Sequence, residues 1–364
     1  MSSVEAVKEA LTHVNDPALG FDIVSAGMVE DVTLDDGKAT IHIRLTTPAC
    51  PSRDTIGNNI TDVVGAMAGV SSVDVRFTAE VRPRASQSAG AKLPGVRNII
   101  AVAAGKGGVG KSTVTTNLAA ALHRHGARVG ILDADIYGPS IPQMMGDPDI
   151  LSATGHGGRI TPAVHMGIKV ISVGFFVERG NPVIWRGPMI HKLLQQFLDD
   201  VDWGELDYLM VDLAPGTGDT QLSLSQLVPI TGAVMVTTPQ EISIIDVEKA
   251  ISMWKRVEVP ILGVVENMSY YHCTSCGHDE PIFARGGGKQ LAEREKVEFF
   301  GEIPIVSAIR GGGDSGKPLT FGEPDSAAAQ NFMAIAGRVA CAVSRRNVPT
   351  PGSGVRSSKL AMIR

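Results

Sequence analysis

The sequence predicts a mostly parallel, doubly wound α/β sheet that is preceded by a small α+β domain. Three short apolar runs carry this prediction, because each has the length of a buried strand and is followed directly by glycine or aspartate: 99–104, 128–132 and 208–211. Helical patterns over 114–125 and 243–257 alternate with such runs, as in sheets with helices on both faces. With 364 residues, the chain is long enough for this sheet and one smaller domain.

Residues 1–85 carry the pattern of the small α+β domain. Apolar residues at helical spacing cover 4–14, and the turn at 35–38 joins two alternating strand patterns. A second helix is expected over 52–67 and a closing strand over 73–77. The small and polar residues of 86–97 predict a linker to the domain of residues 98–345, and residues 346–364 predict a flexible tail.

Composition and charge exclude several classes of function. The net charge of −5 gives no electrostatic reason to expect nucleic acid as the main partner. No apolar run approaches the roughly 20 residues that span a bilayer, so we expect no membrane partner. The N-terminus lacks a basic and apolar leader, and we expect a cytoplasmic protein.

The turn after the first apolar run fits the phosphate-binding loop G-x-x-x-x-G-K-[ST], which predicts a P-loop nucleotide-binding sheet. Its glycines let backbone N–H groups converge on phosphates, and the following helix adds its positive dipole end. Lys111 is placed for the β- and γ-phosphates of ATP, and Ser112 for Mg²⁺. The expected nucleotide-binding residues are Gly105, Lys106, Gly107, Gly108, Val109, Gly110, Lys111, Ser112 and Thr113.

Carboxylates follow two other predicted strands. Asp133 and Asp135 come after one strand, and Asp212 ends another. Open α/β sheets bind ligands at the carboxyl ends of their strands, so these side chains should face the nucleotide. Asp212 fits a Walker B carboxylate that holds Mg²⁺ through water, and the Pro-Gly-Thr-Gly segment of 215–218 would respond to the γ-phosphate.

Two of the four cysteines have metal-ligand spacing. Cys273 and Cys276 form a C-x-x-C, which is compatible with three kinds of site. One is a zinc site completed by His272 and His278, another is a redox dithiol, and the third is half of a four-thiolate site. Cys50 lies close to a predicted helix N-terminus, where a thiol gains thiolate character, although a small buried apolar role suits it equally well.

Lys106, directly after the first glycine, makes the loop resemble the deviant Walker A of the MinD, ParA and nitrogenase iron-protein class. The resemblance implies a nucleotide-sandwich homodimer in which Lys106 reaches the nucleotide of the other copy. It also implies catalytic roles for Lys106, Lys111 and Asp135, of which Asp135 positions the attacking water. Asp133 would lie near Mg²⁺ and its water shell, and Asn267 would contact the adenine.

Further motifs are similar to those of the Mrp/ApbC-type iron–sulfur carrier ATPases. These are the Trp-Arg-Gly-Pro run of 185–188, the segment 212–219, the C-x-x-C and the Gly-rich segment 286–293. The resemblance extends to the first 80 or so residues, which are similar to a PaaD-like small domain. It implies slow ATP hydrolysis, a labile [4Fe–4S] cluster held by Cys273 and Cys276 of two copies, and transfer of that cluster to apo-proteins. The alternatives are a MinD/ParA-like positioning ATPase and a zinc-stabilised nucleotide switch.

Overall fold

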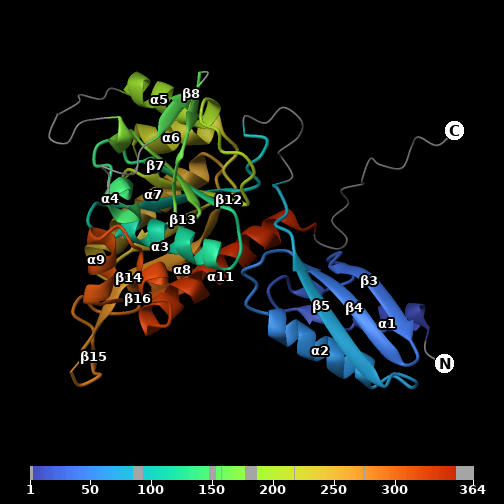
Figure 1. Ribbon diagram of the computed structural model, residues 1–364. Helices are drawn as coiled ribbons and strands as arrows, with labels where there is room; N and C mark the ends of the chain where they lie inside the picture. The colour runs from blue at the N-terminus through green and yellow to red at the C-terminus, as the bar shows by residue number, and fades with distance from the viewer. Residues whose placement is uncertain are drawn as a thin grey trace. The chain divides into compact units, whose positions relative to one another are not determined.

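A computed structural model describes residues 3–84, 93–146, 153–156, 158–176, 187–216, 218–273 and 275–349 (Figure 1). The chain divides into two compact units. The first comprises residues 1–82 together with the chain from Ser344 on, and the second comprises residues 83–343. No helix in the described part of the chain is long and apolar enough to cross a membrane.

The first unit is a small α+β domain, as the sequence predicts. Its three-stranded sheet has the order β3-β4-β5, with β3 antiparallel and β5 parallel to β4. Alternate residues of β4, among them Ile41 and Ile43, are buried against the helices. Its elements are α1 (Val4–Leu11), β1 (Asn15–Asp16), β2 (Phe21–Asp22), β3 (Val29–Asp35), β4 (Lys38–Leu45), α2 (Arg53–Gly65) and β5 (Ser72–Ala79).

The second unit is built on one large, mostly parallel sheet, which confirms the predicted fold class. Its strand order is β10-β11-β7-β12-β6-β13-β14-β15, with β16 also paired to β14. β10 and β15 are its antiparallel strands. The strands are β6 (Ile99–Ala104), β7 (Val129–Ala134), β10 (Ala163–His165), β11 (Ile168–Ser172), β12 (Tyr208–Leu213), β13 (Gly232–Thr237), β14 (Ile261–His272), β15 (Asp279–Glu280) and β16 (Glu298–Ile305), and a separate hairpin pairs β8 (Thr154–His156) with β9 (Arg159–Thr161).

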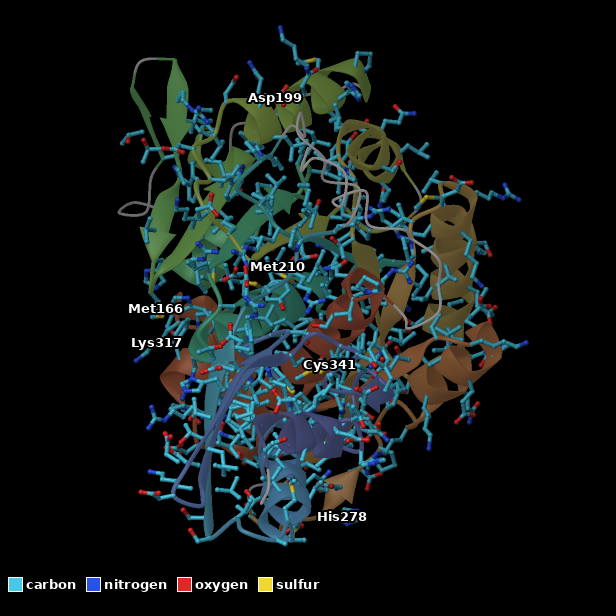
Figure 2. The ribbon with its side chains drawn as sticks, turned by 90° about the vertical axis from the view of Figure 1, so that its right-hand side faces the viewer. Met166, Asp199, Met210, His278, Lys317 and Cys341 are labelled. Carbon is cyan, nitrogen blue, oxygen red and sulfur yellow. The ribbon has the colours of Figure 1, made fainter. Side chains whose placement is uncertain are left out.

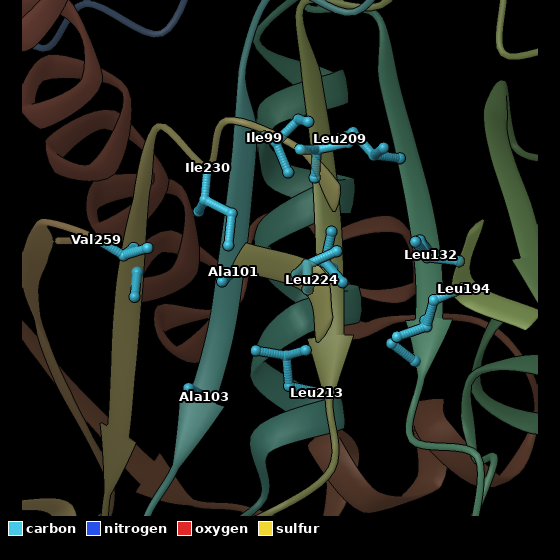
Figure 3. Close-up of a cluster of buried hydrophobic side chains, with 14 of the residues drawn as sticks. Ile99, Ala101, Ala103, Leu132, Leu194, Leu209, Leu213, Leu224, Ile230 and Val259 are labelled. Carbon is cyan, nitrogen blue, oxygen red and sulfur yellow. The ribbon is translucent and has the colours of Figure 1, made fainter. Parts of the chain in front are cut away.

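Helices cover both faces of this sheet. On one face, side chains of the central strands pack with Leu194, Leu224 and other apolar residues of the covering helices (Figure 3). The helix that follows the phosphate-binding loop lies on the opposite face. The helices are α3 (Lys111–Arg124), α4 (Ile141–Met145), the 3₁₀ turn η1 (Val173–Phe175), α5 (Gly187–Asp199), α6 (Asp219–Leu227), α7 (Glu241–Arg256), α8 (Gly287–Glu295), α9 (Ser307–Asp314), α10 (Leu319–Gly322) and α11 (Ala327–Asn347).

The last turn of α11 belongs to the first unit. Arg345 Nη1 donates a hydrogen bond to the Ala18 carbonyl over 2.9 Å, and Asn347 Nδ2 donates to the Arg82 carbonyl over 2.9 Å. Val348 is only 4% exposed and is part of the hydrophobic core of this unit. The helix therefore continues past the expected start of the tail at residue 346, while residues 350–364 lie outside the described residues. Cys341 is buried on the same helix (Figure 2).

Candidate nucleotide and metal sites

The phosphate-binding loop joins the central strand β6 to α3. All six residues of β6 are buried, so the strand fixes the start of the loop. Gly108 and Gly110 both have φ near +81°, a left-handed conformation that favours glycine. A Cβ on Gly110 would also lie 2.2 Å from Asn267 Nδ2, so another residue there would displace the Asn267 side chain.

Lys111 and Ser112 lie over the fully buried carboxylate of Asp212. The Lys111 Nζ is 2.6 Å from Asp212 Oδ2, and the Ser112 hydroxyl donates to the same oxygen over 2.7 Å. Thr115, one turn further along α3, donates to Asp212 Oδ1 over 2.6 Å. The structure thus brings together the lysine, hydroxyl and carboxylate that the sequence predicts. Thr115 is an addition that its i+4 spacing from Lys111 could have indicated.

A cavity of about 190 Å³ lies over this network. It is lined by the loop from Lys106 to Thr113 and by Asp135, Ser140, Met144 and Pro215. Asp135 Oδ2 is 3.7 Å from Lys111 Nζ. The pKa of Asp135 is raised overall, because the effect of burial exceeds the lowering by the lysine charge. Within the described residues, no hydrogen bond or ion pair engages the Lys106 amine, which leaves it available to a ligand or another copy.

Asp133 is not among the residues that line this cavity. Its carboxylate accepts hydrogen bonds from the Ser172 hydroxyl over 2.9 Å and from the backbone N–H groups of Asp135 and Ile141. The side chain is fully buried, and burial followed by the neighbouring charge of Asp212 raises the pKa of Asp133 to about 8. Its contacts hold the segment that carries Asp135 against β11, so its geometry fits an anchor for Asp135 better than an Mg²⁺ ligand.

The Asp133→Asn variant should change how stability depends on pH. Between pH 3.8 and about 8, the native state holds a proton on Asp133 that the unfolded chain has released. The stability from this group is therefore fully present below pH 3.8 and is lost as the pH rises through about 8, with a slope of up to about 1.4 kcal/mol per pH unit. In urea unfolding between pH 5 and 8, the free energy of unfolding of the variant should rise relative to that of the wild type as the pH increases. Parallel curves would contradict the assignment.

The segment after Asp212 is held by a buried glutamine that the sequence analysis missed. The Gln221 Nε2 donates to the carbonyls of Ala214 and Gly216, and the Gly216 N–H donates to the Ala104 carbonyl at the end of β6. These bonds attach the expected γ-phosphate-responsive segment to α6 and to the end of β6, directly before the phosphate-binding loop. Thr217 lies outside the described residues, as do Trp185 and Arg186.

Asn267 lies on β14 beside the phosphate-binding loop. Its Nδ2 donates to the Val109 carbonyl over 2.8 Å, and its side chain is 5% exposed. Within the described residues, its Oδ1 has no hydrogen-bond donor and is available to an amino group of a ligand. The expected contact with adenine remains a prediction that this geometry allows.

Cys273 and Cys276 lie in the turn of a hairpin formed by β14 and β15 (Figure 1). The Cys273 N–H donates to the His278 carbonyl, and the Gly277 N–H donates to the Cys273 carbonyl. The Cys276 side chain is exposed and that of Cys273 is half-buried. Hydrogen bonds from the backbone of Cys276 and Ser275, and then from the Cys276 side chain, lower the pKa of the Cys273 thiol. The turn therefore presents two thiols at the surface, and the pKa of one of them, Cys273, is lowered.

The two histidines next to the cysteines have carboxylate partners. His272 Nδ1 lies 2.7 Å from Asp279 Oδ1, and His278 Nε2 lies 3.2 Å from Glu280 Oε2. In the part of the chain that the structure describes, no group of three or more Cys, His, Asp or Glu side chains could hold a metal ion. The two histidines that an intrachain zinc site would use are thus paired with carboxylates in this structure.

Cys50 is separate from these sites and belongs to the first unit. It precedes α2, is half-buried and packs against the hydrophobic core of that unit. Its contact with the core agrees with the apolar role, and its participation in metal chemistry stays a prediction.

A family model described as NUBPL iron-transfer P-loop NTPase matches residues 95–340, which include the phosphate-binding loop and the cysteine hairpin. The chain belongs to this family. A second model, described as an iron–sulfur cluster assembly protein, matches residues 4–75. Both predicted domains of this P-loop NTPase thus have matches in iron–sulfur proteins, as the resemblance implied.

Individual relatives extend over most of this P-loop NTPase. An iron–sulfur cluster carrier protein of Deinococcus radiodurans is 46% identical over 344 residues, which are 94% of this chain and 97% of the relative. The iron–sulfur cluster carrier protein of Escherichia coli is 39% identical over 349 residues, 95% of this chain and 94% of the relative. A nucleotide-binding protein of Archaeoglobus fulgidus, solved in complex with ADP, is 42% identical with a TM-score of 0.55 and covers 62% of this chain and 89% of its own.

Proposed function

We propose that this P-loop NTPase is an ATP-hydrolysing carrier of a [4Fe–4S] cluster, held between two copies of the chain and transferred to apo-proteins. The observation that carries the proposal is the cysteine turn, which presents two thiols and no third ligand among the described residues. A two-fold axis beside this turn would bring four thiolates together, the ligand set of a [4Fe–4S] cluster. The cluster is then the cargo of the protein.

The nucleotide is held at the phosphate-binding loop in this proposal. Backbone N–H groups of the loop and the Lys111 amine bind the phosphates, for which the cavity of about 190 Å³ provides room. Ser112 and Asp212 would hold Mg²⁺, since a hydroxyl and a carboxylate 2.7 Å apart are the oxygen donors that this ion prefers. The ion would neutralise charge on the phosphates.

The remaining polar groups supply the chemistry of hydrolysis. Asp135, held by Asp133 through its N–H, positions the attacking water, and the free amine of Lys106 stabilises charge at the nucleotide of the other copy. The nucleotide state changes the segment 213–219, which is bonded through Gly216 to the end of β6 just before the loop, and so changes the dimer and the exposure of the cluster. A cytoplasmic location belongs to the same proposal.

Anaerobic reconstitution with iron and sulfide tests the cluster site. The wild type should bind about four irons per dimer, with the visible absorbance of a cluster, because the cysteine turn of each copy supplies two of the four thiolates. A Cys273→Ala/Cys276→Ala variant should bind none, since it lacks the thiolates of the cysteine turn, and the described residues contain no group of three or more Cys, His, Asp or Glu side chains that could replace them.

Cys341→Ala is the matched control, because this cysteine is buried on α11 and should leave the iron content unchanged. One tightly held zinc per monomer and no cluster would overturn the carrier proposal. The protein would then be a zinc-stabilised nucleotide switch.

A further inference from the structure

A second and larger cavity adjoins the phosphate cavity. Its volume is about 530 Å³, and Gly110 and Thr113 of the phosphate-binding loop line both cavities. Most of its other walls are apolar, from Met144, Ile305, Val306 and Ile309 among others. A nucleotide whose phosphates lie on the loop would therefore extend its nucleoside part into an apolar space, which suits the faces of a purine.

Both ends of the cysteine hairpin form walls of this cavity. Asn267 and Met268 line it from β14, which leads directly into the hairpin, and Phe283 lines it just after β15. Cys273 and Cys276 lie in the turn between these two wall segments. A ligand in the cavity would thus contact the chain immediately before and immediately after the hairpin that carries the thiols.

The backbone of β14 is irregular at this point. Met268 has φ of +56°, a left-handed conformation that is uncommon for a residue other than glycine. The pairing of β14 with β16 shifts register between Asn267 and Tyr271, so the regular ladder is interrupted where the hairpin begins. The bond from Asn267 to Val109 attaches this segment to the phosphate-binding loop instead. Irregular, strained backbone of this kind is common at ligand-binding and switch segments.

The resemblance already implies that the adenine of the nucleotide contacts Asn267, which lines this cavity. We infer that a nucleotide with its nucleoside part in the cavity sets the conformation of the cysteine hairpin through Met268 and Phe283. Occupancy adds contacts at both ends of the hairpin and lowers the population of its open forms. The free Oδ1 of Asn267 accepts a hydrogen bond from the amino group of adenine. The effect of the nucleotide on the hairpin does not depend on the proposed function. The inference rests on that function only where it makes the nucleotide a regulator of a cluster bound at the hairpin.

Amide hydrogen exchange on the full-length, reduced, cluster-free protein tests the inference with two ligands. ADP fills both cavities, whereas tripolyphosphate fills only the phosphate cavity. With ADP, exchange of hairpin amides in 268–284 should slow by about fivefold or more, the lower range of typical coupling between sites. Tripolyphosphate should slow exchange in the phosphate-binding loop and leave the hairpin unchanged.

Two variants at neighbouring positions distinguish an effect of the cavity wall from an effect of the hairpin surface. Phe283→Ala should bind ADP and lose most of the protection of the hairpin, because Phe283 lines the cavity. Ile282→Ala is the control, since Ile282 is 53% exposed and is not among the lining residues. It should keep the wild-type response.

Three results would overturn the inference. They are equal protection of the hairpin by tripolyphosphate, ADP binding without protection of the hairpin, and failure of ADP to bind. The wild-type comparison of the two ligands stands even if a variant fails to fold. Because the experiment uses the cluster-free protein, it can succeed when iron reconstitution fails, so the two proposals are tested separately.

Discussion

Replacing Gly105 with alanine should weaken ADP binding by about 10²-fold, the equivalent of one or two charge-assisted hydrogen bonds to phosphate. A Cβ on Gly105 would lie 2.2 Å from the carbonyl carbon of Asp246 and 2.4 Å from the Val247 nitrogen, both in the backbone of α7. Helix backbone cannot rotate aside as a side chain can. The loop must therefore move away from α7, which takes its N–H groups out of line with the phosphates.

The same overpacking should lower the free energy of unfolding by about 1–3 kcal/mol. Calorimetric titration with ADP and urea unfolding measure the two effects. Gly107→Ala is the matched control for stability, because the nearest atom to its added Cβ would be Pro215 Cγ at 3.9 Å, an ordinary contact. A Gly105→Ala protein with wild-type affinity and stability would show that the loop does not pack on α7 as described.

Replacing Asp212 with asparagine should lower the rate of ATP hydrolysis by about 10²–10³-fold, the usual effect of losing one group that stabilises charge in a transition state. The carboxylate is fully buried and accepts hydrogen bonds from Lys111, Ser112 and Thr115. An asparagine keeps the shape but directs an NH₂ group at one of these donors. Lys111, only 7% exposed, would keep Asp135 at 3.7 Å as its ion-pair partner.

The Mg²⁺ dependence of hydrolysis identifies the step affected by Asp212→Asn. If the carboxylate holds Mg²⁺ through water, the variant should also need more Mg²⁺ to reach its half-maximal rate. Asp207→Asn is the control, since Asp207 precedes β12 and pairs with Arg128 away from the phosphate-binding loop. The Asp207→Asn variant should have a lower free energy of unfolding and an unchanged rate of ATP hydrolysis. Wild-type hydrolysis by Asp212→Asn would contradict the role of this residue.

The central strands could be predicted because their apolar runs and their ends are local features. The first run, 99–104, coincides with β6, and the expected strand over 208–212 differs from β12 by one residue. The last residues of β14, which ends at His272, could not be predicted in this way. Its last residues are polar or aromatic, and its pairing with β15 depends on a partner beyond the turn, which no local pattern reveals.

The residues of the candidate site also divide into those that a local motif predicts and those that depend on tertiary structure. The loop, Ser112 and Asp212 follow from a motif with fixed spacing, and the structure brings them together. The orientation of Asp133 could not be predicted, because it depends on Ser172 of β11, and the order of strands in the sheet is a tertiary property. Gln221 is a polar residue inside a helix, and only the packed segment beside it gives that residue a function.

The first unit is formed by both ends of the chain, and this has a consequence for its folding during synthesis. Val348 belongs to its hydrophobic core, yet residues 83–343 must be translated between the N-terminal part and this side chain. At roughly 5–20 residues per second, the ribosome needs between about ten seconds and a minute for that interval. During this time the nascent N-terminal segment has an incomplete core, so a chaperone that binds apolar surface would find it there before the P-loop domain has folded.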